Sequence, residues 1–539
     1  MQQYLISFLI FSPLAAAFVG LFVSSKATAS FRYITLAANM IQIIIALIMV
    51  ISFEPAGGMQ FVEHQPWITL DLGAWGKLQA SYFVGTDGLN FPIVILSVFI
   101  LFIATISSWN VSQNVKGYFL LLLILNASIL GSFTALDFLL FYLFFEFMLL
   151  PMFFLIAIWG GPRREYASIK FFLYTLLGSI FILIAMIGLY ISVHDPSSSG
   201  VLVHTFNILH MAEPMNFISN TILDPNNPWM IGPYNARLWA FLLLFVGFAI
   251  KLPMVPFHTW LPDAHVEAST PISVILAALL LKIGGYGLLR IAFPVFPEAA
   301  IYFGWMIGLM GVISIIYGAL NAMASADLKR LIAYSSVSHM GFVLLGMASL
   351  TSEGVAGSVY QMISHGIITA MLFLIAGVLY DRTHDRMISS YSGLSSKMKS
   401  YTTLVLIAFF ASLGLPGFSG FIAEIMVFLG AFRSGTANGI LPEAFAIIAT
   451  LGLILGAAYY LWTLQRMFFG PFNLKPNLGP ERLSDLSTRE LFMLVPLAAA
   501  TLCFGIFPQP LLEIIDPFAK NFTDFVLKTG TNLTIPYTP

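Results

Sequence analysis

Four ionisable side chains lie inside long apolar runs of this sequence: Glu146, Lys251, Lys282 and Glu424. A charged side chain at the centre of a bilayer costs about 2.5–3.5 kcal/mol on insertion scales, and such residues commonly mark ion pathways. Carboxylates and amines can each hold and release a proton, which is what proton transfer through an apolar medium requires. We therefore predict that these four residues carry protons. The competing interpretation is that they form two ion pairs that only fix helix packing.

The spacing of Glu146 and Lys251 would control how firmly the lysine holds its proton. At an effective dielectric constant of about 20, opposite charges attract by roughly 4 kcal/mol at about 4 Å and by roughly half as much at about 8 Å. Burial independently disfavours the charged form of a lysine. A modest change in the distance between the two groups could therefore decide whether Lys251 keeps its proton.

Three histidines in or beside the apolar runs are predicted proton relays: His258, His339 and His365. An imidazole gives and takes protons near neutral pH. The alternative for each is a packing residue with satisfied hydrogen bonds. A metal site is disfavoured because neither an HExxH motif nor a cysteine pair accompanies His258 and His265. No metal-binding or cofactor-binding residue is predicted on this chain.

Other charges fall near the ends of apolar runs and receive simpler interpretations. Asp137 and Lys170 are expected to reach the membrane interface with their polar ends. The cluster of Asp327, Lys329 and Arg330 is interpreted mainly as an anchor on the positively charged side of the membrane.

The elements that hold these side chains must be membrane-spanning helices. Hydrophobic residues make up 59% of the 539 residues and charged residues only 9%, whereas soluble proteins carry about 25% charged residues. This composition excludes a water-soluble enzyme. The formal net charge of -1 leaves no basic surplus for phosphates, which excludes nucleic-acid binding. One cysteine, Cys503, provides neither an intrachain disulfide nor a cysteine-ligated cluster.

The predicted fold class is an all-α polytopic membrane protein with about fourteen transmembrane helices. Each span needs about 20 apolar residues. The apolar runs lie near residues 3–24, 31–53, 89–108, 117–133, 136–158, 168–193, 237–260, 270–292, 301–322, 331–350, 357–380, 401–430, 442–468 and 490–514. The first run lacks a preceding basic segment and is predicted to be a retained span rather than a signal. The remainder is polar: a stretch near Trp67–Asp87, a loop from Pro196 to Asn235, and a tail after Pro517.

Two of the runs carry prolines and glycines that should interrupt their helices. Pro253 and Pro256 follow Lys251 in the seventh run, and Pro416 and Gly417 precede Glu424 in the twelfth. Broken helices at matching positions of two halves are typical of inverted repeats with an ion site at the break. We predict two five-helix repeats, helices 4–8 and 9–13. The corresponding regions are 1–115 for the first three helices, 116–295 and 296–470 for the repeats, and 471–539 for the last helix and tail.

The distribution of basic residues predicts the orientation in the membrane. Of the 24 Lys and Arg residues, sixteen fall on one side of the predicted spans and six on the other. Cytoplasmic loops retain the excess, so both termini are predicted on the non-cytoplasmic side.

Several motifs resemble the antiporter-like membrane subunits of respiratory complex I. They begin with the segment Lys251-Leu-Pro-Met-Val-Pro-Phe-His-Thr-Trp-Leu-Pro-Asp-Ala-His265 and continue through Leu281-Lys-Ile-Gly-Gly-Tyr-Gly287, Asp327-Leu-Lys-Arg-Leu-Ile-Ala-Tyr-Ser-Ser336, Ser338-His-Met-Gly341 and Ser364-His-Gly366. The M-type (chain 4) branch is the most similar, because Glu424 stands where the L- and N-type sisters place lysine. The likeness extends from about the third span to the thirteenth.

The resemblance implies a function and a set of roles. Glu146 would modulate Lys251, Lys282 would be the central relay, Glu424 the terminal proton site, and the three histidines carriers between them. The chain would translocate protons within an NAD(P)H- or ferredoxin-quinone oxidoreductase, beside L-, N- and K-type membrane subunits and lipids. Flavin, iron–sulfur clusters and quinone would reside on partner subunits. The expected location is an energy-transducing membrane such as the bacterial inner membrane.

Two other functions compete with this one. The first is a subunit of a multisubunit Na⁺/H⁺ antiporter, which would use a similar relay without electron transfer; Glu424 argues against it, because those subunits usually carry lysine there. The second is a structural subunit whose buried charges only brace helices.

Overall fold

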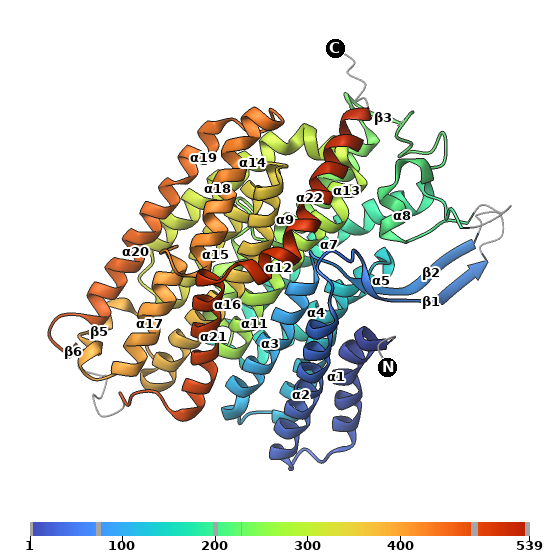
Figure 1. The fold of residues 1–539 in the computed structure, drawn as a ribbon. Coiled ribbons are helices and arrows are strands. Elements are labelled where there is room, and N and C mark those ends of the chain that lie inside the picture. The colour runs from blue at the N-terminus through green and yellow to red at the C-terminus, as the bar shows by residue number, and fades with distance from the viewer. Residues whose placement is uncertain (1–3, 72–76, 198–202, 228, 476–482, 534–539) are drawn as a thin grey trace.

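The computed structural model describes residues 4–71, 77–197, 203–227, 229–475 and 483–533. Within these residues thirteen helices are long and apolar enough to cross a membrane, and they run side by side as a bundle (Figure 1). Each of the fourteen predicted runs contains helix. The predicted fold class, an all-α polytopic membrane protein, is confirmed.

The N-terminal part contains three long helices and a β-hairpin. The hairpin strands are antiparallel, with Gln65 opposite Tyr82. The predicted polar stretch near Trp67–Asp87 is therefore largely this hairpin. The elements are α1 (Leu5–Phe22), α2 (Thr28–Ser52), β1 (Gln60–Asp71), β2 (Lys77–Thr86), α3 (Phe91–Ser107) and η3 (Ser108–Asn110).

The next part places Glu146, Lys251 and Lys282 on three different helical segments. Two spans are built from consecutive pieces: α5 and α6 together cover Phe138–Trp159, and the segments from α11 to α13 together cover Thr270–Val295. The elements are α4 (Val115–Thr134), α5 (Phe138–Phe147), α6 (Leu149–Trp159), α7 (Arg164–Ser192), α8 (Ile208–Ala212), η4 (Pro214–Asn216), β3 (Met230–Ile231), β4 (Tyr234–Asn235), α9 (Ala236–Lys251), α10 (Trp260–Glu267), α11 (Thr270–Ile275), η5 (Leu276–Leu280), α12 (Leu281–Gly287), η6 (Leu288–Ala292) and α13 (Phe293–Val295).

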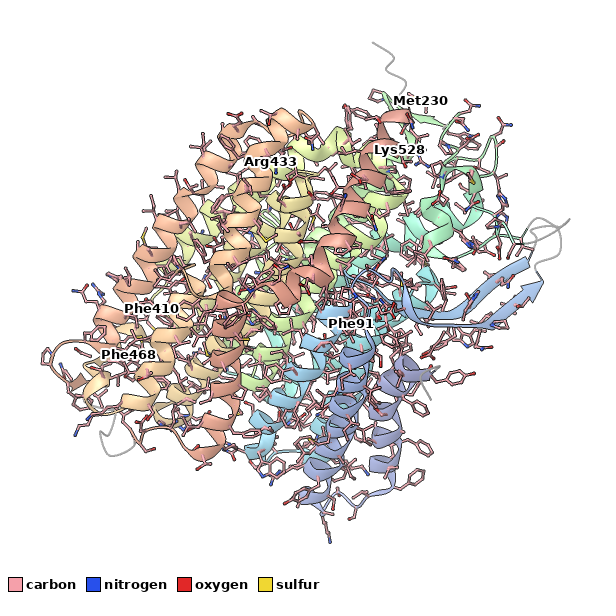
Figure 2. All side chains as sticks on the ribbon, in the orientation of Figure 1. Phe91, Met230, Phe410, Arg433, Phe468 and Lys528 are labelled. Carbon is pink, nitrogen blue, oxygen red and sulfur yellow. The ribbon has the colours of Figure 1, made fainter. Side chains whose placement is uncertain are left out.

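The last part holds His339, His365 and Glu424 and ends in a long helix. The elements are α14 (Pro297–Ala324), α15 (Leu328–Ala348), α16 (Ser352–Thr383), η7 (Ile388–Ser390), β5 (Tyr391–Ser392), η8 (Leu394–Ser396), α17 (Lys399–Ser412), α18 (Ser419–Ala437), α19 (Glu443–Ala449), α20 (Leu451–Phe468), β6 (Asn473–Leu474), α21 (Thr488–Ile506) and α22 (Gln509–Asn532). Side chains fill the spaces between these helices (Figure 2).

Both predicted helix breaks occur where the sequence placed them. α9 ends at Lys251 and α10 begins at Trp260, whereas α17 ends at Ser412 and α18 begins at Ser419. Proline cannot donate a backbone hydrogen bond and clashes with the preceding turn, so neither helix can continue through its segment. The last residue of α9 is thereby a lysine, and its charge lies at the negative end of the helix dipole.

The polar tail predicted after Pro517 belongs to a long helix. α22 extends from Gln509 to Asn532 and packs against α13, α14 and α16. Its buried residues recur every three or four positions, at Leu511, Ile515, Ala519, Phe522 and Val526. This spacing forms one apolar stripe on an otherwise polar helix. The predicted last span, residues 490–514, therefore divides between α21 and α22.

The two most deeply buried spans lie in the middle of the bundle. The helical segment Thr270–Val295 and α16 are enclosed by other helices along their whole apolar windows. They carry Lys282 and His365. A charge in these positions is remote from both lipid and solvent, so its partners must come from neighbouring helices.

Candidate functional site

Lys282 and His365 form the closest contact between two predicted site residues. Lys282 Nζ lies 2.7 Å from His365 Nδ1 and donates a second hydrogen bond, also 2.7 Å long, to the carbonyl oxygen of Ala277. Lys282 is fully buried and His365 is 2% exposed. A buried amine within hydrogen-bonding distance of an imidazole is suitably placed for proton transfer between the two.

Two π-helical turns flank Lys282 on its own span. η5 precedes α12 and η6 follows it, and Ala277, whose carbonyl binds the Lys282 ammonium, belongs to η5. π-turns inside α-helices are uncommon and occur frequently at functional sites, because they displace carbonyl groups from the regular hydrogen-bond ladder. The local backbone thus supplies a carbonyl partner for the buried charge.

His339 connects His365 to Glu424. The rings of His339 and His365 lie 5.5 Å apart between centroids, and His339 Nδ1 lies 3.6 Å from Glu424 Oε1. The Gln361 amide nitrogen is 3.1 Å from the same Nδ1 atom. α12, α16, α15 and α18 therefore contribute one residue each to a line from Lys282 to Glu424.

A chain of hydroxyl groups extends from the other nitrogen of His339. Nε2 lies 3.3 Å from the Ser412 hydroxyl, which is 2.6 Å from the hydroxyl of Tyr460. Tyr460 donates in turn to Ser335, at 3.1 Å. Ser412 is the last residue of α17, at the predicted break. Hydroxyl groups can both donate and accept, so this chain fixes the ring and can also conduct a proton.

Glu146 and Lys251 lie near each other without direct contact. Lys251 is 1% exposed, and its ammonium lies 5.0 Å from the centroid of Phe145, the residue beside Glu146. No ion pair within 4.0 Å joins the two charges, whereas Glu146 does act electrostatically on Lys251. Among the described residues neither Lys251 Nζ nor Glu146 Oε1 has a hydrogen-bond partner. The pair is thus in the separated arrangement, with weaker attraction than a contact pair would have.

His258 stands apart from the other predicted relays. It lies in the break between α9 and α10, is 3% exposed, and faces the ring of Tyr317 at 5.0 Å. Both of its ring nitrogens lack a hydrogen-bond partner in the described part of the chain. The structure therefore brings Lys282, His365, His339 and Glu424 together, places Glu146 near Lys251, and leaves His258 on the α14 side.

Residues 135–450 match the family described as "NADH:quinone oxidoreductase/Mrp antiporter, TM". The matched stretch is more than half of the chain, and it includes all seven predicted site residues. The chain belongs to this family.

Relatives in the NADH:quinone oxidoreductase/Mrp antiporter family cover nearly the full length. NADH-quinone oxidoreductase subunit M of Rhodobacter capsulatus is 41% identical over 521 residues, which is 96% of this chain and 96% of that protein. Among solved structures, a chain of respiratory complex I from Thermus thermophilus with bound NADH has a TM-score of 0.80 at 28% identity, covering 98% of this chain and 100% of that one. The resemblance to M-type subunits is confirmed.

The antiporter side of the family shares the fold. A chain of the Mrp complex from Dietzia sp. DQ12-45-1b has a TM-score of 0.78 at 21% identity, covering 98% of this chain and 99% of that one. At this identity the match shows the common helix arrangement alone.

The structure corrects two predictions about charged residues, those for Asp137 and Lys329. Asp137 does not reach the interface: it is 1% exposed, accepts from the backbone of Leu140 at the start of α5, and accepts from the backbone and hydroxyl of Ser81. Lys329 is not a surface anchor, because it is 3% exposed and lies in the first turn of α15. Lys170 forms a partly exposed ion pair with Asp263 at 2.7 Å.

His265 is a buried histidine that the sequence analysis considered only as a metal ligand. It is fully buried on α10, and its ring stacks on Phe373 with centroids 4.5 Å apart. No group of three or more His, Cys, Asp or Glu side chains that could hold a metal ion occurs in the described part of the chain. The signal that could have revealed His265 is its place three residues after the Pro262 of the broken span.

Proposed function

We propose that this chain is the proton-translocating membrane-arm subunit of a complex I-type NAD(P)H- or ferredoxin-quinone oxidoreductase. The observation that carries the proposal is the line of buried ionisable side chains from Lys282 through His365 and His339 to Glu424. The assignment to a quinone oxidoreductase is supported by the M-type relative, which is 41% identical over nearly the whole chain.

Each residue has a role that follows from its position. Glu146, at the end of α5, stabilises the ammonium form of Lys251 when the two approach, because opposite charges attract more strongly at short range. Lys282 exchanges its proton with His365 across 2.7 Å. His339 passes the proton on to Glu424, which is the last group of the line. The gap between Lys251 and Lys282 is bridged by water.

The distance between Glu146 and Lys251 controls whether Lys251 holds its proton. When Glu146 moves away, Lys251 loses its electrostatic partner and the ammonium is left in an apolar site, where a charge is unfavourable. Its proton then passes toward Lys282. The energy needed to move one charge against 100 mV is about 2.3 kcal/mol, which is similar to the difference of about 2 kcal/mol between a close and a separated pair.

The redox chemistry belongs to partner subunits that hold flavin, iron–sulfur clusters and quinone. This chain binds L-, N- and K-type membrane subunits and lipids within a hetero-oligomer, and it lies in an energy-transducing membrane with both termini on the non-cytoplasmic side. Its contribution to the enzyme is the proton path.

Charge-neutral substitutions test the proposal. In Glu146→Gln and Lys251→Met we expect normal assembly of the complex, with proton uptake per quinone reduced falling by about tenfold or more, because a proton-transfer group is lost. The matched control is Glu298→Gln. Glu298 binds Arg237 through both oxygens in a buried ion pair that bridges α9 and α14, so its neutralisation should lower assembly instead. Normal pumping per assembled complex in Glu146→Gln and Lys251→Met would contradict the proposal and favour a bracing role.

The second candidate is a subunit of a multisubunit Na⁺/H⁺ antiporter, which the shared fold favours. Gentle solubilisation of the membrane and isolation of this chain distinguish the two. Flavin and iron–sulfur absorbance in the purified particle would select the redox complex. A particle without these absorbances that exchanges Na⁺ for H⁺ in liposomes would select the antiporter.

A further inference from the structure

The buried histidine on α10 lies outside the proposed path from Lys251 to Glu424. His265 is fully buried, and neither ring nitrogen has a hydrogen-bond partner among the described residues. Leaving polar atoms unpaired in an apolar interior costs free energy. Packing alone does not require the two nitrogens, because a phenyl ring would stack equally well on Phe373.

Lys329 lies beside the same turn of backbone as His265. Lys329 Nζ donates at 2.9 Å to the carbonyl oxygen of Ala268, three residues after His265. The hydroxyl of Ser273 donates to the carbonyl oxygens of both His265 and Ala268, at 3.1 and 3.3 Å. The charged groups that act electrostatically on the His265 ring are Lys329 and Lys282. His265 therefore lies within electrostatic range of both Lys329 and the central lysine of the path.

A small cavity lies outside Lys329 on the face with most Lys and Arg residues. Its volume is about 90 Å³, and its polar lining residues include Arg163, Asp263, Glu267, Asp327 and Arg330. A space of this size holds a few water molecules at about 30 Å³ each. The charges that act electrostatically on Lys329 are the Arg386 guanidinium and the carboxylates of Asp327, Asp381 and Glu267. The cavity therefore brings water to the buried Glu267, which lies within electrostatic range of the buried Lys329.

We propose that Glu267, Lys329 and His265 form a proton-uptake branch that leads from this membrane face to Lys282. The inference rests on the proposed function. Lys329 gives one Nζ proton to an imidazole nitrogen of His265, leaving a neutral amine and an imidazolium. The amine regains a proton from the Glu267 carboxyl, which is protonated from the cavity. The imidazolium gives its proton through water to the neutral amine of Lys282 and returns to its starting form. Only N–H and O–H bonds form and break.

Lys329→Arg separates proton transfer from a structural role. Arginine keeps the positive charge and can still donate to the carbonyl of Ala268, but it does not lose its proton in proteins. We expect proton uptake per quinone reduced to fall by about tenfold or more in both Lys329→Arg and Lys329→Met. The matched control is Lys116, which donates to the carbonyl oxygens of Leu21 and Val23. Lys116→Arg and Lys116→Met should leave the ratio unchanged.

His265→Phe removes both ring nitrogens and keeps an aromatic ring against Phe373. We expect the same loss of proton uptake as in Lys329→Arg, measured on the whole complex in proteoliposomes. Added imidazole should restore part of the uptake in His265→Ala, because it can occupy the space of the missing ring. Rescue separates proton transfer from packing even if His265→Phe assembles poorly.

Lys282→Met in the same preparation keeps the two proposals distinguishable. Normal pumping in Lys282→Met would reject the proposed function itself. Defective pumping in Lys282→Met, together with wild-type ratios in Lys329→Arg and His265→Phe, would overturn the uptake branch and leave the proposed function intact. A defect in Lys329→Met that Lys329→Arg fully repairs would also overturn the branch, because it would show that only the charge and its hydrogen bond matter.

Discussion

Lys282 has fewer hydrogen-bond partners than a buried ammonium can use. An ammonium group has three donors, and Nζ contacts the Ala277 carbonyl and the His365 ring within the described part of the chain. His365 Nε2 is itself buried without a partner. A purely structural charge would be expected to have its hydrogen bonds satisfied. The incomplete set of hydrogen bonds around Lys282 Nζ therefore favours a role in which this amine releases and regains a proton.

If the Lys282 amine transfers protons, Lys282→Met should lower proton uptake without lowering the stability of the complex. Methionine has a similar volume and no charge, so the substitution removes the free-energy cost of burying an ammonium group that has too few partners. We expect the melting temperature of the purified complex to stay equal or rise, while proton uptake per quinone reduced falls by about tenfold or more. Loss of assembly with unchanged pumping in the assembled fraction would instead assign Lys282 to bracing.

At the residue scale the sequence predicts charges in apolar runs and fails for charges outside them. The burial of Lys282, His365, His339 and Glu424 was predictable because each interrupts a run of about 20 apolar residues. That of His265 and Lys329 was not, because α10 is short and polar and Lys329 precedes its run. Their burial results from packing between helices that are distant in sequence. The contact from His339 to Glu424 joins residues of two helices, and no sequence spacing determines it.

At the scale of elements, Gly284 holds the two lysine-bearing segments together. A Cβ atom on Gly284 would lie 2.6 Å from the backbone nitrogen of Leu252 and 2.6 Å from the backbone oxygen of Phe248. Phe248 lies in the last turn of α9, and Leu252 directly follows Lys251, the last residue of that helix. α12 can therefore approach this end of α9 only because residue 284 lacks a side chain.

We therefore predict that Gly284→Ala destabilises the protein by about 1–3 kcal/mol, because the added methyl group overpacks two backbones. It should also lower proton uptake, since it displaces Lys251 relative to Lys282. Thermal unfolding and proteoliposome assays measure the two effects. Gly188→Ala on α7 is the control: its Cβ would meet only Leu223 at 3.6 Å, so stability should be unchanged or slightly higher. Equal behaviour of the two variants would contradict the close packing of α9 and α12.

Asp485 caps the N-terminus of α17 from a distant part of the chain. Its carboxylate accepts from the backbone of Ser400 at 2.9 Å and of Tyr401 at 3.0 Å. Burial raises the pKa of Asp485, but hydrogen bonds from the amides of Ser400, Tyr401 and Leu486 outweigh it and hold that pKa below the usual value. A negative charge is favourable at this end of a helix.

Asp485→Asn should therefore destabilise the protein by about 1 kcal/mol at neutral pH, because it removes the negative charge at the helix N-terminus and one of the two acceptor oxygens. Because the folded-state pKa is lowered, the stabilisation by the charge is complete above the unfolded value of about 3.9 and is lost as the pH falls through the folded value. The difference between wild type and Asp485→Asn should shrink below about pH 4. Thermal melts of the two proteins over this pH range measure it, and a constant difference would exclude a contribution from the carboxylate charge.

Elements differ in how well the sequence reveals them. The long spans were predictable because a continuous apolar run has few structural alternatives in a membrane. The breaks followed from Pro253, Pro256 and Pro416. α22 was missed because its apolar stripe covers one face only, so its average composition is that of a polar tail. The π-turns beside Lys282 have no residue pattern of their own and depend on the neighbouring helices.

At the scale of the whole molecule, the side of the membrane on which each loop lies sets the direction of proton movement. Met230, Lys528 and Arg433 lie toward one end of the helix bundle, whereas Phe468 lies toward the other (Figure 2). The loop of Met230 was predicted to be non-cytoplasmic. The loop after Phe468 was predicted to be cytoplasmic, because most of the Lys and Arg residues fall on that side of the predicted spans. The cavity beside Glu267 opens on the side predicted to be cytoplasmic. The predicted orientation therefore makes the cytoplasm the source of the protons that enter the uptake branch.

Labelling of single cysteines tests this orientation. In a Cys503→Ser background, Met215→Cys lies in the loop before α9, where Met215 is 82% exposed, and Lys397→Cys lies at an exposed position before α17. A membrane-impermeant maleimide should label Met215→Cys in right-side-out vesicles and Lys397→Cys in inside-out vesicles, because the basic residues keep the second loop in the cytoplasm. The Cys503→Ser protein alone sets the background. The opposite labelling pattern would place the opening of the uptake branch on the non-cytoplasmic side. Glu267, Lys329 and His265 would then form a path for proton release instead of proton uptake.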